Sequence, residues 1–136
     1  IGADWQRVTA CFSLPKVVAF TGHMLDRPDR AAERFPAELV EPVKREIGAR
    51  LEAWGQVIGY SSAACGSDLL FLESLLERRM EIVVVLPFPA SQFVATSVDF
   101  AGPAMRSRFD AVMQECGEPI VASPWRAVGV PNACAG

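Results

Sequence analysis

The chain has 136 residues, of which 51% are hydrophobic and 21% are charged, a balance typical of one globular domain with a buried core. The formal net charge of −3 argues against a dedicated nucleic-acid binder, and no apolar run reaches the roughly 18 residues of a membrane span. The start lacks the basic and apolar regions of a signal peptide, so we expect a cytoplasmic protein without a nucleic-acid or membrane partner.

The first half of the chain predicts two strands joined by a long loop and a helix. Residues 1–15 show no clear period, and we expect a lead-in or a short edge strand there. The β-branched apolar run at 16–20 predicts a buried strand, and the polar stretch at 24–36 predicts a loop. Apolar residues at helical spacing then predict a helix from near Val40 to Trp54, and residues 56–61 predict the second strand.

The second half continues the alternation of helices and strands. A helix is expected to open on Ser67 and Asp68, directly after the turn glycine Gly66. The remaining expected elements are a strand at 81–86, a short helix or turn at 91–100, a helix at 104–116, a strand at 119–122 and a loose tail over 123–136.

This alternation predicts an α/β fold over residues 16–122, a Rossmann-like open parallel sheet with helices on both faces. The strand at 81–86 is apolar without alternation, which is typical of a strand that is buried on both faces. Ligands of such sheets bind beyond the carboxyl ends of the strands. Three segments are expected to meet there, at 21–23, 61–68 and 87–89.

The run from Ser61 to Asp68 consists of small residues that lead through Gly66 into a helix. Small residues let a ligand approach the backbone, and a helix start offers unpaired N–H groups and a partial positive charge. The run therefore predicts an anion site, above all for phosphate. The alternative is a plain strand–helix turn in which Ser67 or Asp68 caps the helix.

The four cysteines have wide, irregular spacing without a C-x-x-C pair: Cys11, Cys65, Cys116 and Cys134. Only Cys65 lies in the expected ligand turn, where the helix start would lower its thiol pKa; the alternative is a small buried filler residue. His23, the single histidine, is either a ligand contact or a structural hydrogen-bonding residue. No cluster of histidine, cysteine and carboxylate suggests a metal site, and we expect no cofactor.

Several arginines are candidates for phosphate contacts, with a solvated surface as the alternative for each of them. Those in the loop after the first strand are placed to close over a ligand, and those in the last helix to approach the mouth of the pocket. These residues are Arg27, Arg30 and Arg34 in the loop, and Arg106 and Arg108 in the helix.

The order of four short motifs resembles the SLOG superfamily, the Rossmann-like domains that include the LOG phosphoribohydrolases and the DNA-processing protein DprA. The motifs are Thr21-Gly22-His23, Gly66-Ser67-Asp68-Leu69-Leu70-Phe71, Leu86-Pro87-Phe88-Pro89 and Arg108-Phe109-Asp110. The resemblance covers residues 16–113 and implies a pocket for a nucleotide or a nucleotide derivative.

The resemblance also assigns roles within that pocket. Thr21, Gly22 and His23 would line one wall; Ser61, Ser62, Gly66, Ser67 and Asp68 would hold phosphate or ribose; Pro87 and Phe88 would face the base or a second ribose. Domains of this group are often fused to signalling or effector modules, and related domains commonly pair. A start at Ile1 rather than at Met agrees with a piece of a longer protein.

The chain departs from the LOG enzymes in one motif. Their catalytic turn, PGGxGTxxE, is replaced by Pro87-Phe88-Pro89-Ala90, without a glycine pair or a following glutamate. Glu73 follows Gly66 by seven residues, but after a different strand, so no catalytic role is assigned to it.

Three functions remain open. The first, which we favour, is a sensor that binds a nucleotide-type signal and acts on a fused or associated effector. The second is an enzyme that cleaves the N-glycosidic bond of a nucleoside monophosphate, with Asp68 or Glu73 as the nearby carboxylate. The third is an interaction domain with a vestigial pocket that self-associates.

Overall fold

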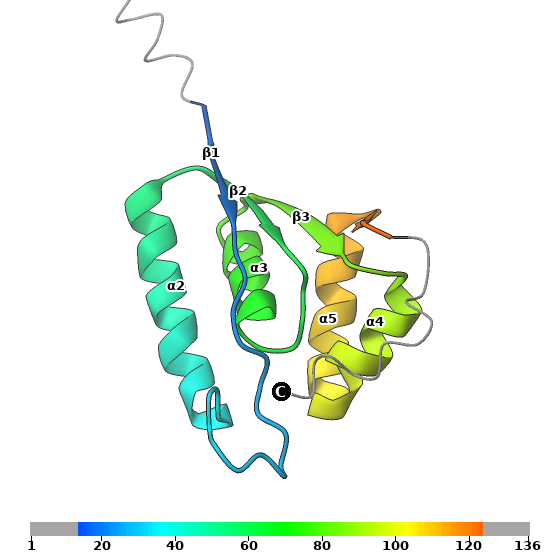
Figure 1. Ribbon diagram of the computed structural model, residues 1–136. Helices are drawn as coiled ribbons and strands as arrows, with labels where there is room; N and C mark the ends of the chain where they lie inside the picture. Colours follow the sequence, from blue (N-terminus) through cyan, green and yellow to red (C-terminus); the bar gives the residue numbers. More distant parts are fainter. Residues whose placement is uncertain (1–13, 124–136) are drawn as a thin grey trace, which may run out of the picture.

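The computed structural model describes residues 14–123, and Figure 1 shows how their helices and strands are arranged. The elements follow in the order β1 (Lys16–Ala19), η1 (Ala37–Leu39), α2 (Val40–Trp54), β2 (Val57–Ser61), α3 (Ser67–Glu77), β3 (Glu81–Leu86), α4 (Ala90–Ser97), η2 (Asp99–Ala101), α5 (Pro103–Cys116) and β4 (Ile120–Val121). The alternation expected from the sequence is confirmed for these residues. The expectations for 1–15 and 123–136 fall outside the described residues, except at Leu14, Pro15 and Ser123.

The ends of the helices lie where local chemistry predicts them. Pro42 stands in the first turn of α2, where its missing N–H has no intrahelical acceptor to lose. Gly55 follows α2 with φ of 78°, and Gly117 follows α5 with φ of 72°. Both glycines take a left-handed backbone at the point where the helix must stop.

The four strands form one parallel sheet in the order β1-β2-β3-β4. The open parallel α/β sheet is thus confirmed, but in residues 14–123 the helices α2, α3 and α5 do not cover both faces. The reason is topological: each right-handed crossover leads to the next strand in the same direction, so each crossover helix falls on the same side. Helices on both faces require a strand order that reverses.

The opposite face of the sheet is apolar and open to solvent among the described residues. Alternate side chains of β2 and β3 are buried beneath the helices, whereas the side chains between them are half-buried. On β1, Val17 is 69% exposed and Ala19 is exposed as well. The register places Ala19, Tyr60 and Val83 in one apolar row across β1, β2 and β3, whereas the row through Val17 and Ile58 ends at Glu81.

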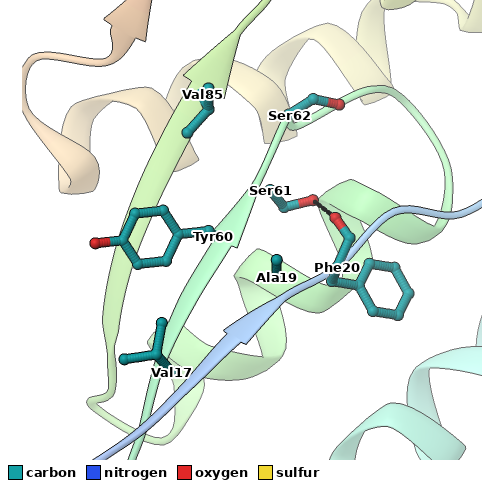
Figure 2. Close-up of a pocket in the computed structure, with 7 residues that line it drawn as sticks. All are labelled: Val17, Ala19, Phe20, Tyr60, Ser61, Ser62 and Val85. Carbon is teal, nitrogen blue, oxygen red and sulfur yellow. Dashed lines mark hydrogen bonds between the residues drawn. The ribbon is translucent and has the colours of Figure 1, made fainter.

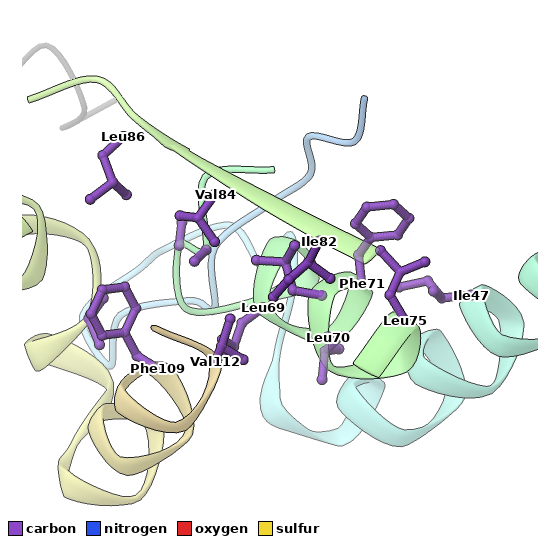
Figure 3. Close-up of a cluster of buried hydrophobic side chains, with 14 of the residues drawn as sticks. Ile47, Leu69, Leu70, Phe71, Leu75, Ile82, Val84, Leu86, Phe109 and Val112 are labelled. Carbon is purple, nitrogen blue, oxygen red and sulfur yellow. The ribbon is translucent and has the colours of Figure 1, made fainter. Parts of the chain in front are cut away.

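The core lies between β2, β3 and the central helix α3. Figure 3 shows Val84 of β3, Leu69 of α3 and Val112 of α5 meeting in this core. Helix α3 is buried on nearly every side, because the sheet covers one flank and α2 and α5 lie against it. No helix within residues 14–123 combines the length and the apolar character needed to cross a membrane.

Candidate functional site

The turn between β2 and α3 is tightly packed and conformationally strained. Ala63 has a φ of 63°, a left-handed conformation that costs a non-glycine residue roughly 1 kcal/mol. Ala63 and Cys65 are fully buried. The Cys65 N–H donates to the carbonyl of Ser97 at 3.0 Å, and the Cys65 carbonyl accepts from the Leu25 N–H at 2.9 Å. The turn is therefore held between the end of α4 and the loop that follows β1.

The amino end of α3 is occupied by the protein's own backbone. The N–H of Ser67 and its hydroxyl both donate to the carbonyl of His23, at 3.1 and 2.9 Å. Gly66 has a φ of 143°, and a Cβ there would press on that carbonyl and stand 2.7 Å from the Cα of Met24. Gly66 is thus required by the close approach of the loop after β1, a partner that the sequence pattern did not reveal.

Asp68 links the loops that follow β1 and β2. Its Oδ1 accepts from the Gly22 N–H at 2.8 Å, and its Oδ2 accepts from the Ser62 hydroxyl at 2.5 Å. The side chain is buried, and burial raises the pKa of the carboxyl above its ordinary value; the hydrogen bonds from Ser62 and Gly22 oppose that rise only in part. Asp68 therefore fixes the relative positions of Gly22 and Ser62 at the carboxyl edge of the sheet.

A hollow of about 450 Å³ opens beside this edge, on the face of the sheet that the helices leave uncovered (Figure 2). Its lining comes from three neighbouring strands and the residues that follow them: Val17, Ala19, Phe20, Tyr60, Ser61, Ser62 and Val85. None of these side chains is charged. The volume lies within the range of small-molecule sites.

The ten residues expected to bind a ligand differ in their exposure to solvent. Six are accessible: Thr21, Gly22, His23 and Pro87 are exposed, and Ser62 and Phe88 are half-buried. The other four are buried: Ser61, Gly66, Ser67 and Asp68. The buried residues hold the loops together, as when the Ser61 hydroxyl donates to the Phe20 carbonyl at 2.9 Å (Figure 2). Phe88 packs beside Phe93, with 6.1 Å between the ring centroids.

Glu73 lies in an ion-pair cluster between helices and contributes nothing to the hollow. Arg108 of α5 binds it through two hydrogen bonds, of 2.7 and 2.5 Å, and Lys44 of α2 lies 3.9 Å away. The candidate carboxylate for glycosidic cleavage is therefore paired among the helices. Among residues 14–123, no group of three or more histidine, cysteine, aspartate and glutamate side chains comes together as a metal site would require.

Four of the five arginines considered for phosphate contacts have other partners, Arg108 through Glu73 and three more as follows. Arg27 lies over the ring of Phe100, 4.2 Å from its centroid, and Arg30 donates to the Ala32 carbonyl at 2.8 Å. Arg106 pairs with Asp99 and Asp110. These contacts leave the solvated-surface alternative as the better description of Arg27, Arg30 and Arg106.

Cys65 is a buried filler residue. Burial raises the pKa of its thiol to about 11, the opposite of the lowering expected beside an accessible helix start. The residues that the sequence interpretation missed are those on the open face, Val17, Ala19, Tyr60 and Val85. The strand at 81–86 is apolar without alternation, so its sequence carried no signal that one face of the sheet would stay uncovered.

No known protein-family model matches the chain, and no curated protein matches it at a significant level.

Proposed function

We propose that this protein binds a nucleotide or a nucleotide-derived molecule at the carboxyl edge of its sheet and serves as a sensor for it. Occupancy would be passed to a fused or associated effector, in the manner of the SLOG-type domains that its motifs resemble. The proposal rests on residues of three segments, Thr21–His23, Ser61–Asp68 and Pro87–Phe88, at the ends of adjacent strands.

One observation carries the proposal. Asp68 joins Gly22 to Ser62 beside an open, uncharged hollow, so two loops that are distant in sequence are held in one arrangement by the protein's own hydrogen bonds. A prearranged site loses less conformational freedom on binding than one that must first be ordered. Sensing is favoured over glycosidic cleavage because Asp68 is buried in structural hydrogen bonds and Glu73 is paired with Arg108.

The test is to incubate the purified protein with a panel of nucleosides, nucleotides and dinucleotides. Mass spectrometry of the protein-bound and free fractions then separates the alternatives. Intact ligand on the protein supports a sensor and identifies its class. Release of free base with turnover would show that the protein is a hydrolase rather than a sensor. If the protein retains no compound and releases no base, both functions are refuted.

Ser62→Ala is the informative variant, because Ser62 is half-buried, lines the hollow and donates its hydroxyl to Asp68. Ser107→Ala is the matched control, since Ser107 is exposed on α5. We expect weaker binding only in the first variant. Equal losses in both would count against the position given to the site.

A further inference from the structure

The outer edge of β1 carries backbone groups that have no partner within residues 14–123. Among these residues β1 lies at the end of the sheet and pairs with β2 alone. The N–H groups of Lys16 and Phe20 donate toward β2, each at 2.9 Å. Because successive residues of a strand point their backbone groups to opposite sides, those of Val17 and Ala19 point away from the sheet.

The side chains at this edge are apolar and exposed. Leu14 is 87% exposed and Val17 is 69% exposed, the two highest values among the large hydrophobic side chains of the described residues. Lys16 carries the one charge of β1, so the rest of the strand lacks the charged side chains that commonly protect a sheet edge. An unpaired, uncharged edge of this kind is a template for another strand.

The edge is complementary to itself about a two-fold axis. When a second copy lies antiparallel to β1 with the axis at Val18, Val17 of each copy stands opposite Ala19 of the other, and the two residues exchange backbone hydrogen bonds. A large, exposed side chain then meets a small one on the open face of the sheet. Pro15 has no N–H to donate, which disfavours a register shifted toward the start of the strand.

This register brings no like charges together. Lys16 stands opposite Phe20 of the second copy, and the two Lys16 residues lie roughly 14 Å apart along the strand direction, beyond the screening length of about 8 Å at physiological ionic strength. β1 has only four residues, so the contact falls below the roughly 1,200 Å² of stable interfaces. The dimer is therefore weak, and it forms as the protein concentration rises.

From these features we propose that a second copy of this chain pairs antiparallel with the free edge of β1 and contributes its Val17 to the hollow of the first copy. Ala19 lines the hollow (Figure 2), and Val17 of the second copy stands beside it, on the side away from Tyr60. The hollow thereby gains an apolar wall beyond β1. The part of this wall in ligand binding rests on the proposed function, whereas the pairing does not.

Sedimentation velocity and amide hydrogen exchange of the wild type, at about 50 μM and about 1 mM, test the pairing. We expect the sedimentation coefficient to approach that of a dimer, and exchange at the Val17 and Ala19 amides to slow several-fold, at the higher concentration. The Phe20 amide already donates to Tyr60 and should exchange slowly at both concentrations. A monomer throughout, or a dimer in which the Val17 and Ala19 amides exchange as before, would overturn the pairing.

Val17→Pro tests the same edge by mutation. Proline removes a donor that faces outward and leaves the bonds to β2 in place, a position where a sheet tolerates it. Val17→Thr is the matched control, because threonine keeps the N–H and the branched shape. We expect Val17→Pro to raise the dimer dissociation constant about tenfold or more and Val17→Thr to change it by less than about twofold. Equal constants would overturn the pairing, and wild-type exchange decides the question if Val17→Pro does not fold.

The contribution to the hollow is tested with the same panel of nucleosides, nucleotides and dinucleotides, at protein concentrations below and above the dimer dissociation constant. Tighter binding by the dimer supports the wall formed by Val17. Binding that does not depend on protein concentration would remove Val17 of the second copy from the site and leave the proposed function standing. If no compound binds, the proposed function fails together with this wall, whereas the pairing is judged by hydrogen exchange alone.

Discussion

The carboxylate of Asp68 allows a direct test of how the two loops are held, by comparison of Asp68→Ala with Asp68→Asn. Alanine removes the acceptors of both the Gly22 N–H and the Ser62 hydroxyl. Asparagine keeps the shape and one carbonyl acceptor, and its amide can donate to Ser62. The two variants therefore separate the loss of hydrogen bonding from the loss of charge.

The expected magnitudes follow from two opposing effects. Each hydrogen bond to a carboxylate contributes about 1.5–3 kcal/mol, but burial of the charge costs free energy that both variants recover. The pKa of Asp68 is raised because burial disfavours the charged carboxylate by more than the hydrogen bonds from Ser62 and Gly22 favour it. We expect Asp68→Ala to lower the free energy of unfolding by about 2 kcal/mol, and Asp68→Asn to change it by less than about 1 kcal/mol.

The pH dependence has a definite sign. The ordinary pKa of the carboxyl is 3.8, and the folded-state pKa is higher. Between these two values the folded state keeps a proton that the unfolded state has released, so lowering the pH favours folding. The wild type should gain stability relative to Asp68→Asn as the pH falls through this window, and this gain should be absent near pH 7.

Urea unfolding followed by circular dichroism, from about pH 7 to about pH 4, measures both effects. Equal losses in the free energy of unfolding for Asp68→Ala and Asp68→Asn would contradict the separation of hydrogen bonding from charge. The pH argument fails if the wild type loses stability relative to Asp68→Asn as the pH falls, because that sign belongs to a carboxylate with a lowered pKa.

Three further predictions concern residues around the site. Gly66→Ala should lower the free energy of unfolding by about 2–4 kcal/mol in thermal unfolding, because its Cβ meets the backbone of the loop after β1. The control Gly102→Ala, at φ of 92° with open space around it, should lower it by only about 1 kcal/mol, and equal losses would contradict the packing argument. Cys65, with a thiol pKa of about 11, should resist alkylation in the folded protein far longer than the half-buried Cys116, as peptide mapping would reveal; rapid labelling of Cys65 would disprove its burial. Glu73→Gln should lower the free energy of unfolding by about 1 kcal/mol in urea, because it weakens the pair with Arg108, and it should leave ligand affinity unchanged. Weaker binding in this variant would show that Glu73 takes part in the binding site.

The order and type of the elements followed from local patterns. Apolar residues at helical spacing marked α2, and the unbroken apolar run from Ile82 to Leu86 marked β3. Gly55 and Gly117 stop their helices for a reason that lies within a few residues of each. Such features need no knowledge of distant partners, which is why the sequence alone predicts them.

The features that the sequence did not reveal depend on distant contacts. The carbonyl that occupies the start of α3 belongs to His23, 44 residues before Ser67. The strand order, which leaves one face without helices, is likewise invisible in local spacing. Gly66 was correctly predicted as a turn glycine, but the group that approaches it belongs to this chain's own loop.

The open face of the sheet also affects how the fold responds to denaturants and temperature. Apolar side chains such as Val17 and Ala19 already meet water in the folded state of the described residues. Unfolding therefore brings less new apolar surface into water than it does in a sheet covered on both faces. Because the denaturant slope and the heat-capacity increment both scale with newly exposed surface, we expect residues 14–123 to contribute a smaller slope and a smaller increment than a sheet of the same size covered on both faces.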